Sequence, residues 1–161
     1  MTPRVQVVDG HQTDDLLGMG ALDGTVIMPR PPLPSHQKHL FDIGHNLLNQ
    51  GQYSISIVVF HMACEVAVAR ALDRAYAAKG LQDLQPAIDE FMNGYNLANH
   101  RNRDLYNSLL GVEIDKQPFW SAFCESAFRR NKIIHRGLIV TQADAHASYQ
   151  ACHDFLTHVG I

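Results

Sequence analysis

Residues 52–79, QYSISIVVFHMACEVAVARALDRAYAAK, decide the fold class of this chain. Apolar side chains recur there at steps of three and four, the period of an α-helix, namely Ile55, Val58, Val59, Met62, Val66, Ala69, Leu72 and Tyr76. They cover most of the circumference, which is typical of a helix in the middle of a bundle. His61, Glu65 and Arg70 interrupt the run and argue against a membrane span, so we expect no contact with a membrane.

The sequence on both sides of this segment also has the helical period. Glycine follows several of the apolar runs and predicts helix ends, and Thr141 with Asp144 three residues later forms a capping signature. The further predicted helices span residues 35–50, 81–92, 100–110, 118–136 and 141–159. We therefore predict an all-α, up-and-down bundle of four to six helices over residues 35–161.

Residues 1–34 differ from the rest and are predicted to form an extended, non-helical N-terminal arm. Glycines punctuate the segment, and it ends in PRPPLP at residues 29–34, a run that excludes a helix. Residues 4–9 and 25–28 have the character of two short strands of a hairpin, with an extended arm without pairing as the alternative. The proline run is interpreted as a rigid connector, with a proline-rich recognition motif as the alternative.

The composition fits one globular domain in a reducing compartment. The chain has 161 residues, 46% of them hydrophobic and 18% charged, and its formal net charge is −3. This balance excludes a protein that coats nucleic acid by bulk charge. Cys64, Cys124 and Cys152 are widely spaced without a CxxC pattern, so we expect free, buried thiols. Because the N-terminus has no signal-peptide pattern, the expected location is the cytoplasm.

Positive charge concentrates in one part of the chain, although the net charge is negative. Residues 100–136 hold seven Lys/Arg and four Asp/Glu, a local charge of +3, whereas the rest holds six and twelve, a charge of −6. The densest part is FRRNKIIHRG at residues 128–137. Such a cluster suits an anionic ligand such as a phosphate group.

Within this cluster, Arg130-Asn131-x-x-x-His135 resembles the Arg-polar-x-x-x-His motif of HEPN domains. LNQGQY at residues 48–53 resembles the break between the first two HEPN helices, and MACEVA at residues 62–67 resembles their second helix. The resemblance covers the whole predicted bundle. HEPN domains are small helical proteins, often dimeric, and many are metal-independent endoribonucleases of toxin–antitoxin and phage-defence systems. The resemblance therefore implies an RNA substrate and an antitoxin or another regulatory protein as partner.

The resemblance also implies a role for each polar residue of the motif. Because histidine titrates near neutral pH, His135 would be the general acid/base, and Arg130 would clamp the phosphate without losing its proton. Asn131 would orient either group. The substrate-binding residues would be Asn131, Lys132, Arg129 and Arg136. This chemistry uses no cofactor and no metal, and it yields a 2′,3′-cyclic phosphate and a 5′-hydroxyl.

Helix geometry separates the two implied catalytic residues. Five residues at 100° each place Arg130 and His135 about 140° apart around an ideal helix. They converge if the helix distorts, if Arg130 bends back along it, or if two subunits pool their motifs. HEPN proteins use the last solution, so the resemblance implies a homodimer with a composite site. Some HEPN toxins carry a tyrosine two residues after the histidine, which a partner nucleotidyltransferase modifies; Gly137 occupies this position here and argues against that control.

His61 and Glu65 are the candidate supporting residues. Four positions apart on one predicted helix, they have the spacing of two metal ligands, but the sequence supplies no HExxH pattern and no third ligand. Alternatively, a buried Glu65 needs a cationic partner, and Arg130 is a suitable one. Two further interpretations of the chain stay open: a non-catalytic HEPN-like dimer that binds a nucleotide, RNA or protein, and a structural dimer without an active site.

Overall fold

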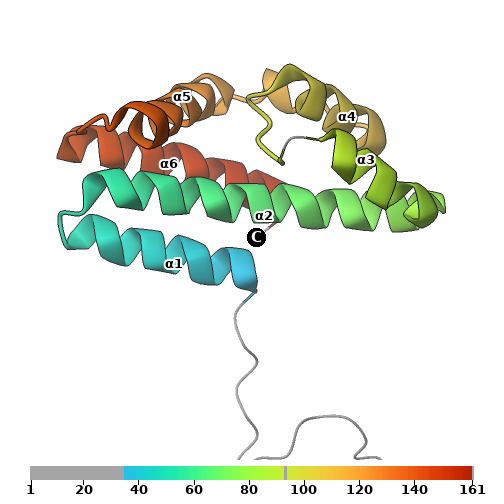
Figure 1. Ribbon diagram of the computed structural model, residues 1–161, viewed down its shortest axis with the longest axis horizontal. Coiled ribbons are helices and arrows are strands. Elements are labelled where there is room, and N and C mark those ends of the chain that lie inside the picture. The colour runs from blue at the N-terminus through green and yellow to red at the C-terminus, as the bar shows by residue number, and fades with distance from the viewer. Residues whose placement is uncertain (1–34, 93, 161) are drawn as a thin grey trace, which may run out of the picture. The chain divides into compact units, whose positions relative to one another are not determined.

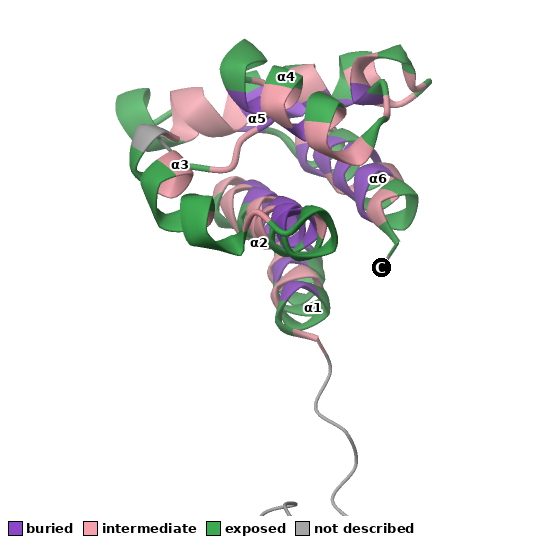
Figure 2. Ribbon diagram, turned by 90° about the vertical axis from the view of Figure 1, so that its right-hand side faces the viewer, coloured by how far each residue is buried: buried purple, intermediate pink, exposed green. Residues whose placement is uncertain are grey.

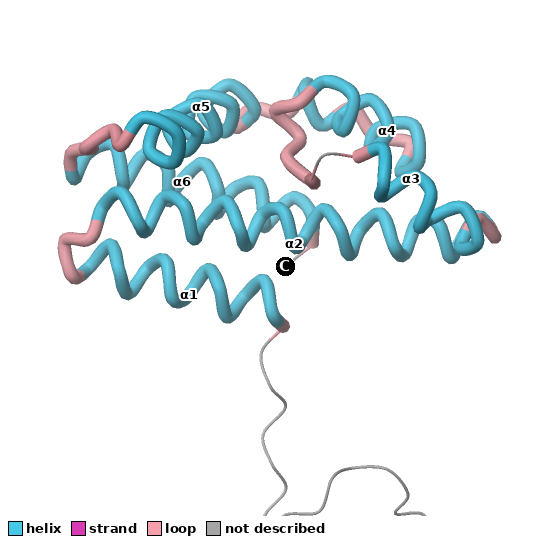
Figure 3. Tube along the Cα trace, viewed as in Figure 1, coloured by secondary structure: helices cyan, strands magenta, loops and turns pink. Residues whose placement is uncertain are grey.

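The computed structural model describes residues 35–92 and 94–160, and in this part of the chain it contains helices and no strand. This confirms the all-α prediction. The predicted arm, residues 1–34, lies outside the described residues. The α-helices are α1 (His36–Asn49), α2 (Tyr53–Lys79), α3 (Gln85–Phe91), α4 (His100–Leu110), α5 (Trp120–Arg136) and α6 (Gln142–Val159). Single-turn 3₁₀ helices at Gln82–Leu84 and Ile114–Lys116 complete the described secondary structure (Figures 1 and 3).

Helix α2 is the central element, in contact with α1, α4, α5 and α6. By length and composition alone it could cross a membrane, with a mean hydropathy of 1.8 over an 18-residue window, but 56% of that window is buried inside the bundle. The apolar residues that mark the helical period of α2 are buried to different extents, and only some of them, such as Leu72 and Tyr76, lie in the core. Ile55 and Met62 are 53% and 43% exposed, whereas Phe60 and Val68 are buried. On a helix that is apolar nearly all round, the periodicity does not fix the rotation about the axis.

Helices α1 and α2 form an antiparallel pair joined by a short turn (Figure 1). Gly51 makes this turn with φ = 76°, in the left-handed region that favours glycine. Gly44 lets the two helices approach closely, because a Cβ atom there would lie 2.6 Å from Cδ1 of Phe60. The rings of Phe41 and Phe60 pack with their centroids 5.1 Å apart. The close approach at Gly44 and the packing of these two rings thus hold α1 against α2.

Helices α5 and α6 close the core against α2. Figure 2 shows buried residues on α2, α5 and α6 where these helices face one another. The rings of Phe123 on α5 and Phe155 on α6 stack at 4.4 Å between centroids. The predicted capping box of α6 is confirmed, since Thr141 Oγ1 accepts from the Asp144 N–H and the Asp144 carboxylate accepts from the Thr141 N–H.

Two predicted helix boundaries differ from the structure. Residues 81–92 were predicted as one weak helix but form a 3₁₀ turn followed by α3, with Pro86 in the first turn of α3 where its missing N–H is not needed. Helix α5 begins at Trp120, two residues after Pro118. It ends as predicted at Gly137, whose N–H donates to the carbonyl of Ile133.

Candidate functional site

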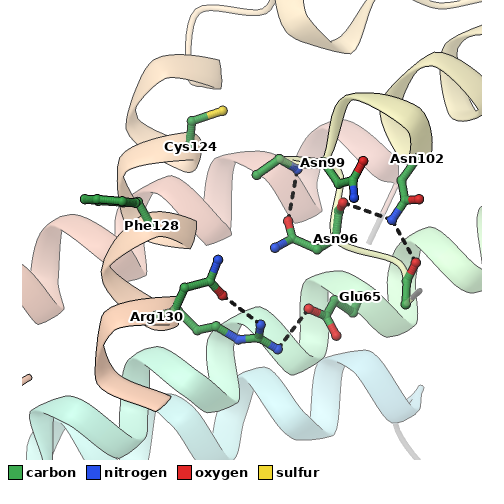
Figure 4. A pocket seen from close by; sticks show the side chains of 10 residues that line it. Glu65, Asn96, Asn99, Asn102, Cys124, Phe128 and Arg130 are labelled. Carbon is green, nitrogen blue, oxygen red and sulfur yellow. Dashed lines mark hydrogen bonds and ion pairs between the residues drawn. The ribbon is translucent and has the colours of Figure 1, made fainter. Parts of the chain in front are cut away.

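The candidate site is a cleft of about 710 Å³ at the side of α5. Helix α5 forms one wall, α2 contributes to the floor, and the loop before α4 with the first turn of α4 forms the opposite wall (Figure 4). The polar and aromatic side chains of its lining include Glu65, Asn96, Asn99, Phe128, Arg130 and Asn131. The cleft is polar for a space of this size, because amide and charged groups outnumber the apolar ones in its lining.

Arg130 lies at the junction of α5, α2 and this cleft. Its Nη2 is 3.0 Å from Oε1 of Glu65, so the ion pair expected from the sequence is confirmed. Its Nη1 donates to Oδ1 of Asn131 at 3.1 Å. The two ionic side chains are 19% and 27% exposed. Oriented from two sides, the guanidinium is held in one position at the edge of the cleft.

His135 lies in the last turn of α5, exposed to solvent, and is not part of the cleft lining. Within one chain the structure therefore does not bring Arg130 and His135 together in the cleft. This agrees with their predicted separation around an ideal helix. Large apolar side chains near His135 are also exposed: Ile134 by 46%, Leu138 by 38% and Ile139 by 90%. Ile139 and the half-exposed Ile55 of α2 line one shallow depression, so this apolar surface extends from α5 to α2.

The other basic residues of the motif have separate environments. Arg129 faces α6, where its Nη1 donates to Ser148 Oγ at 3.0 Å and its Nε lies 3.3 Å from Asp144 Oδ1. The ammonium group of Lys132 lies over the ring of Phe128, 4.3 Å from its centroid. Arg136 is exposed at the end of α5. Lys132 and Arg136 remain accessible to a ligand, whereas Arg129 joins two helices.

His61 and Glu65 use different partners. His61 is buried, its Nε2 lies 2.8 Å from Ser126 Oγ, and its ring packs against Phe123. Glu65 instead turns to Arg130. Across the described residues, no group of three His, Cys, Asp or Glu side chains has the arrangement of a metal site. The structure thus gives His61 a place in the core and Glu65 a place in the cleft.

Of the asparagines of the cleft, Asn131 was predicted as a site residue, whereas Asn96, Asn99 and Asn102 were missed from the sequence. Asn96 Oδ1 accepts from the Ala98 N–H, and Asn99 Oδ1 accepts from the Arg101 N–H, each at 2.9 Å. Asn102 is buried and donates to the carbonyls of Gly94 and Asn96. The available signal was Asn99 directly before a helical run, since asparagine is a preferred N-cap residue. It predicts a helix start, not a cleft.

No protein-family model matches the sequence, and no curated protein or solved structure matches it either. The function must therefore be argued from the residues themselves. They supply an arginine fixed at the edge of a polar cleft, an exposed histidine further along the same helix, and an exposed apolar surface beside that histidine.

Proposed function

We propose that this chain is a metal-independent endoribonuclease of the HEPN type, which acts as a homodimer. The observation that supports the proposal most is the arrangement of Arg130 and His135 on α5. Arg130 is fixed by Glu65 and Asn131 at the edge of an open cleft, and His135 on the same helix is free to meet a ligand. A motif that only ended a helix would not need an ion pair to α2 to orient its arginine.

The proposed reaction uses the two side chains in different ways. The 2′-oxygen of a ribose attacks the adjacent phosphorus atom, and the bond from phosphorus to the 5′-oxygen breaks. One imidazole of His135 takes the proton of the 2′-hydroxyl, and a protonated imidazole gives a proton to the departing 5′-oxygen. Arg130 stabilises the charge on the phosphate oxygens, with N–H groups that Glu65 and Asn131 do not use.

A second copy of the chain supports this chemistry. Because Arg130 and His135 diverge within one chain, a two-fold axis near the end of α5 would place the partner's His135 opposite Arg130. The exposed Ile134, Leu138 and Ile139 beside His135 are the apolar surface that such contact would cover. The same assembly would put two copies of Lys132 and Arg136 around one RNA strand. As an RNA-cutting toxin or defence effector in the cytoplasm, the dimer would need an antitoxin or another protein to restrain it.

The test is incubation of the purified chain with mixed RNA in the presence of EDTA. We expect cleavage with 2′,3′-cyclic phosphate ends, and a rate at least about a hundredfold lower for His135→Ala, since a positioned acid/base contributes about that much. His146→Ala is the matched control, because His146 is an exposed histidine on α6. Loss of cleavage on adding EDTA, or equal cleavage by His135→Ala, contradicts the mechanism. No cleavage by any variant favours the non-catalytic binding module.

A further inference from the structure

Three asparagine side chains of the cleft have a fixed orientation. The carbonyl oxygens of Asn96 and Asn99 each accept from a backbone N–H, and that of Asn131 accepts from Arg130. Backbone N–H groups and guanidinium groups only donate, so the atom that faces them in each amide must be the oxygen. The NH₂ group of each asparagine is left for a ligand. In the part of the chain that the structure describes, these NH₂ groups have no acceptor.

The cleft is consequently rich in hydrogen-bond donors and close to neutral in charge. Three NH₂ groups line it, and the positive charge of Arg130 is balanced by Glu65 at 3.0 Å. A free phosphate would gain the donors but would also meet the carboxylate of Glu65. A neutral ligand with several acceptor oxygens avoids that repulsion. The second oxygen of Glu65, Oε2, remains as the acceptor for one N–H of such a ligand.

Phe128 places an exposed aromatic ring at the rim of the cleft. Its side chain is 62% exposed although it lines the cleft, and Lys132 lies against its ring. An exposed aromatic ring beside a cation is a stacking platform for a flat ligand, and a phosphate attached to that ligand would meet the ammonium group. In Figure 4 the ring of Phe128 lies on the side of α5 away from Asn96, so Phe128 borders the cleft at its rim and does not face the opposite loop. The volume of about 710 Å³ is sufficient for one nucleoside.

We infer that the cleft binds one nucleobase of the RNA, and that it selects bases with a carbonyl oxygen next to a ring N–H. Uracil and guanine have this pair of groups on their pairing edge, whereas adenine and cytosine do not. The asparagine NH₂ groups donate to the carbonyl oxygens, and Glu65 accepts from the ring N–H. The inference rests on the proposed function for the identity of the ligand as RNA, but its test does not require cleavage.

The test measures binding of the four free nucleosides to the full chain by NMR. Nucleosides carry no phosphate, so attraction to Lys132 and Arg136 does not obscure the base preference. Asn96→Asp and Asn99→Asp replace an NH₂ donor by an acceptor and keep the oxygen that caps the backbone, so both variants are expected to fold. Asn46→Asp on α1, outside the cleft lining, is the matched control for one added charge.

We expect uridine and guanosine to bind at least about fivefold more tightly than adenosine and cytidine, roughly the effect of one hydrogen bond. Asn96→Asp and Asn99→Asp should remove this preference, and Asn46→Asp should keep it. Equal binding of the four nucleosides, or no binding up to their solubility limit, overturns the inference even if the chain cleaves RNA. Selective binding by a chain that cleaves no RNA supports the base pocket and contradicts only the proposed nuclease.

Discussion

Arg130 on α5 and Glu65 on α2 form a partly buried ion pair with 3.0 Å between Nη2 and Oε1, across 65 positions of sequence. The pair links the motif helix to the central helix and sets where the guanidinium lies in the cleft. Both side chains are largely shielded from solvent, so the ion pair resembles an internal pair more than a surface pair. The arginine of the proposed site thus also joins two helices, and the proposed role and the structural role must be separated by experiment.

The ion pair should appear as coupling in a double-mutant cycle. Glu65→Ala and Arg130→Ala each leave one charge without its partner, and we expect each to lower the free energy of unfolding by about 1–3 kcal/mol. The double variant should lose less than the sum, by about 1 kcal/mol. Urea denaturation measures all four chains. Glu125→Ala, which removes an exposed carboxylate on α5, is the control, and strict additivity would argue against the pair.

The close approach of α1 and α2 gives a second expectation. An alanine at position 44 would place its Cβ 2.6 Å from the ring of Phe60 and should cost about 1–3 kcal/mol, despite the better helix propensity of alanine. The variant Phe60→Leu makes room, so Gly44→Ala should cost less in that background. Thermal unfolding of the single and double variants tests this. Asn46→Ala, at an exposed position on the same helix, controls for helix propensity.

The capping box of α6 predicts a pH dependence of stability. A hydrogen bond from the Thr141 side chain, aided by its backbone N–H and by Arg129, holds the pKa of Asp144 below its ordinary 3.8. A carboxyl whose pKa is lower in the folded state stabilises the fold above its unfolded pKa, and this contribution is lost as the pH falls through the folded value. Because solvent screens this half-exposed carboxylate, we expect Asp144→Ala to destabilise the chain by about 0.3–1 kcal/mol at pH 7.

The difference in denaturation midpoint between wild type and Asp144→Ala should shrink below about pH 4. Asp83→Ala, an exposed carboxylate on the 3₁₀ turn before α3, controls for the loss of one acidic group. A difference that stays constant down to pH 2 would mean that Asp144 does not cap α6 through its charge.

The three cysteines should differ in reactivity. Cys64 and Cys152 are buried, whereas Cys124 is partly exposed and lines the cleft. Burial raises the pKa of the Cys124 thiol above its ordinary 9.0. Because the thiolate reacts, alkylation of the native chain by iodoacetamide should occur first at Cys124 and accelerate about tenfold per pH unit from pH 7 to 9. Peptide mass spectrometry identifies the site, with Cys124→Ser as control. Faster labelling of Cys64 or Cys152 would show that the core opens.

The helical architecture was predictable because its signals are local. Glycine ended α2 and α5 where the sequence predicted, and the spacing of Thr141 and Asp144 predicted the start of α6. The Glu65–Arg130 pair was also predictable, since a carboxylate on an apolar helix needs a cation and the motif offered one. Each of these inferences used one short segment or one pair of charges.

The features that the sequence did not predict depend on the rotation of each helix about its axis and on the position of the loops. The buried face of α2 was not predictable because apolar residues surround the helix, so the face that carries buried residues such as Ala67 is set by the neighbouring helices. Glu65, Arg130 and Asn131 of the cleft were predicted as site residues, but the asparagine-lined wall on the other side of the cleft was not. The cleft forms from α2, α5 and the loop before α4, and nothing in residues 93–99 by themselves indicates which helices they will face.

The antiparallel pair of α1 and α2 has a consequence for the order of folding. Its contacts join segments that are neighbours in sequence, so they close a short loop at little entropic cost, whereas the cleft needs residues from three distant segments. We expect this hairpin to be already formed in the folding transition state, with high φ-values for Ile57 and Leu48 and low ones for Asn102. The cleft would then be the last part of the described bundle to assemble and the first to open in native-state hydrogen exchange.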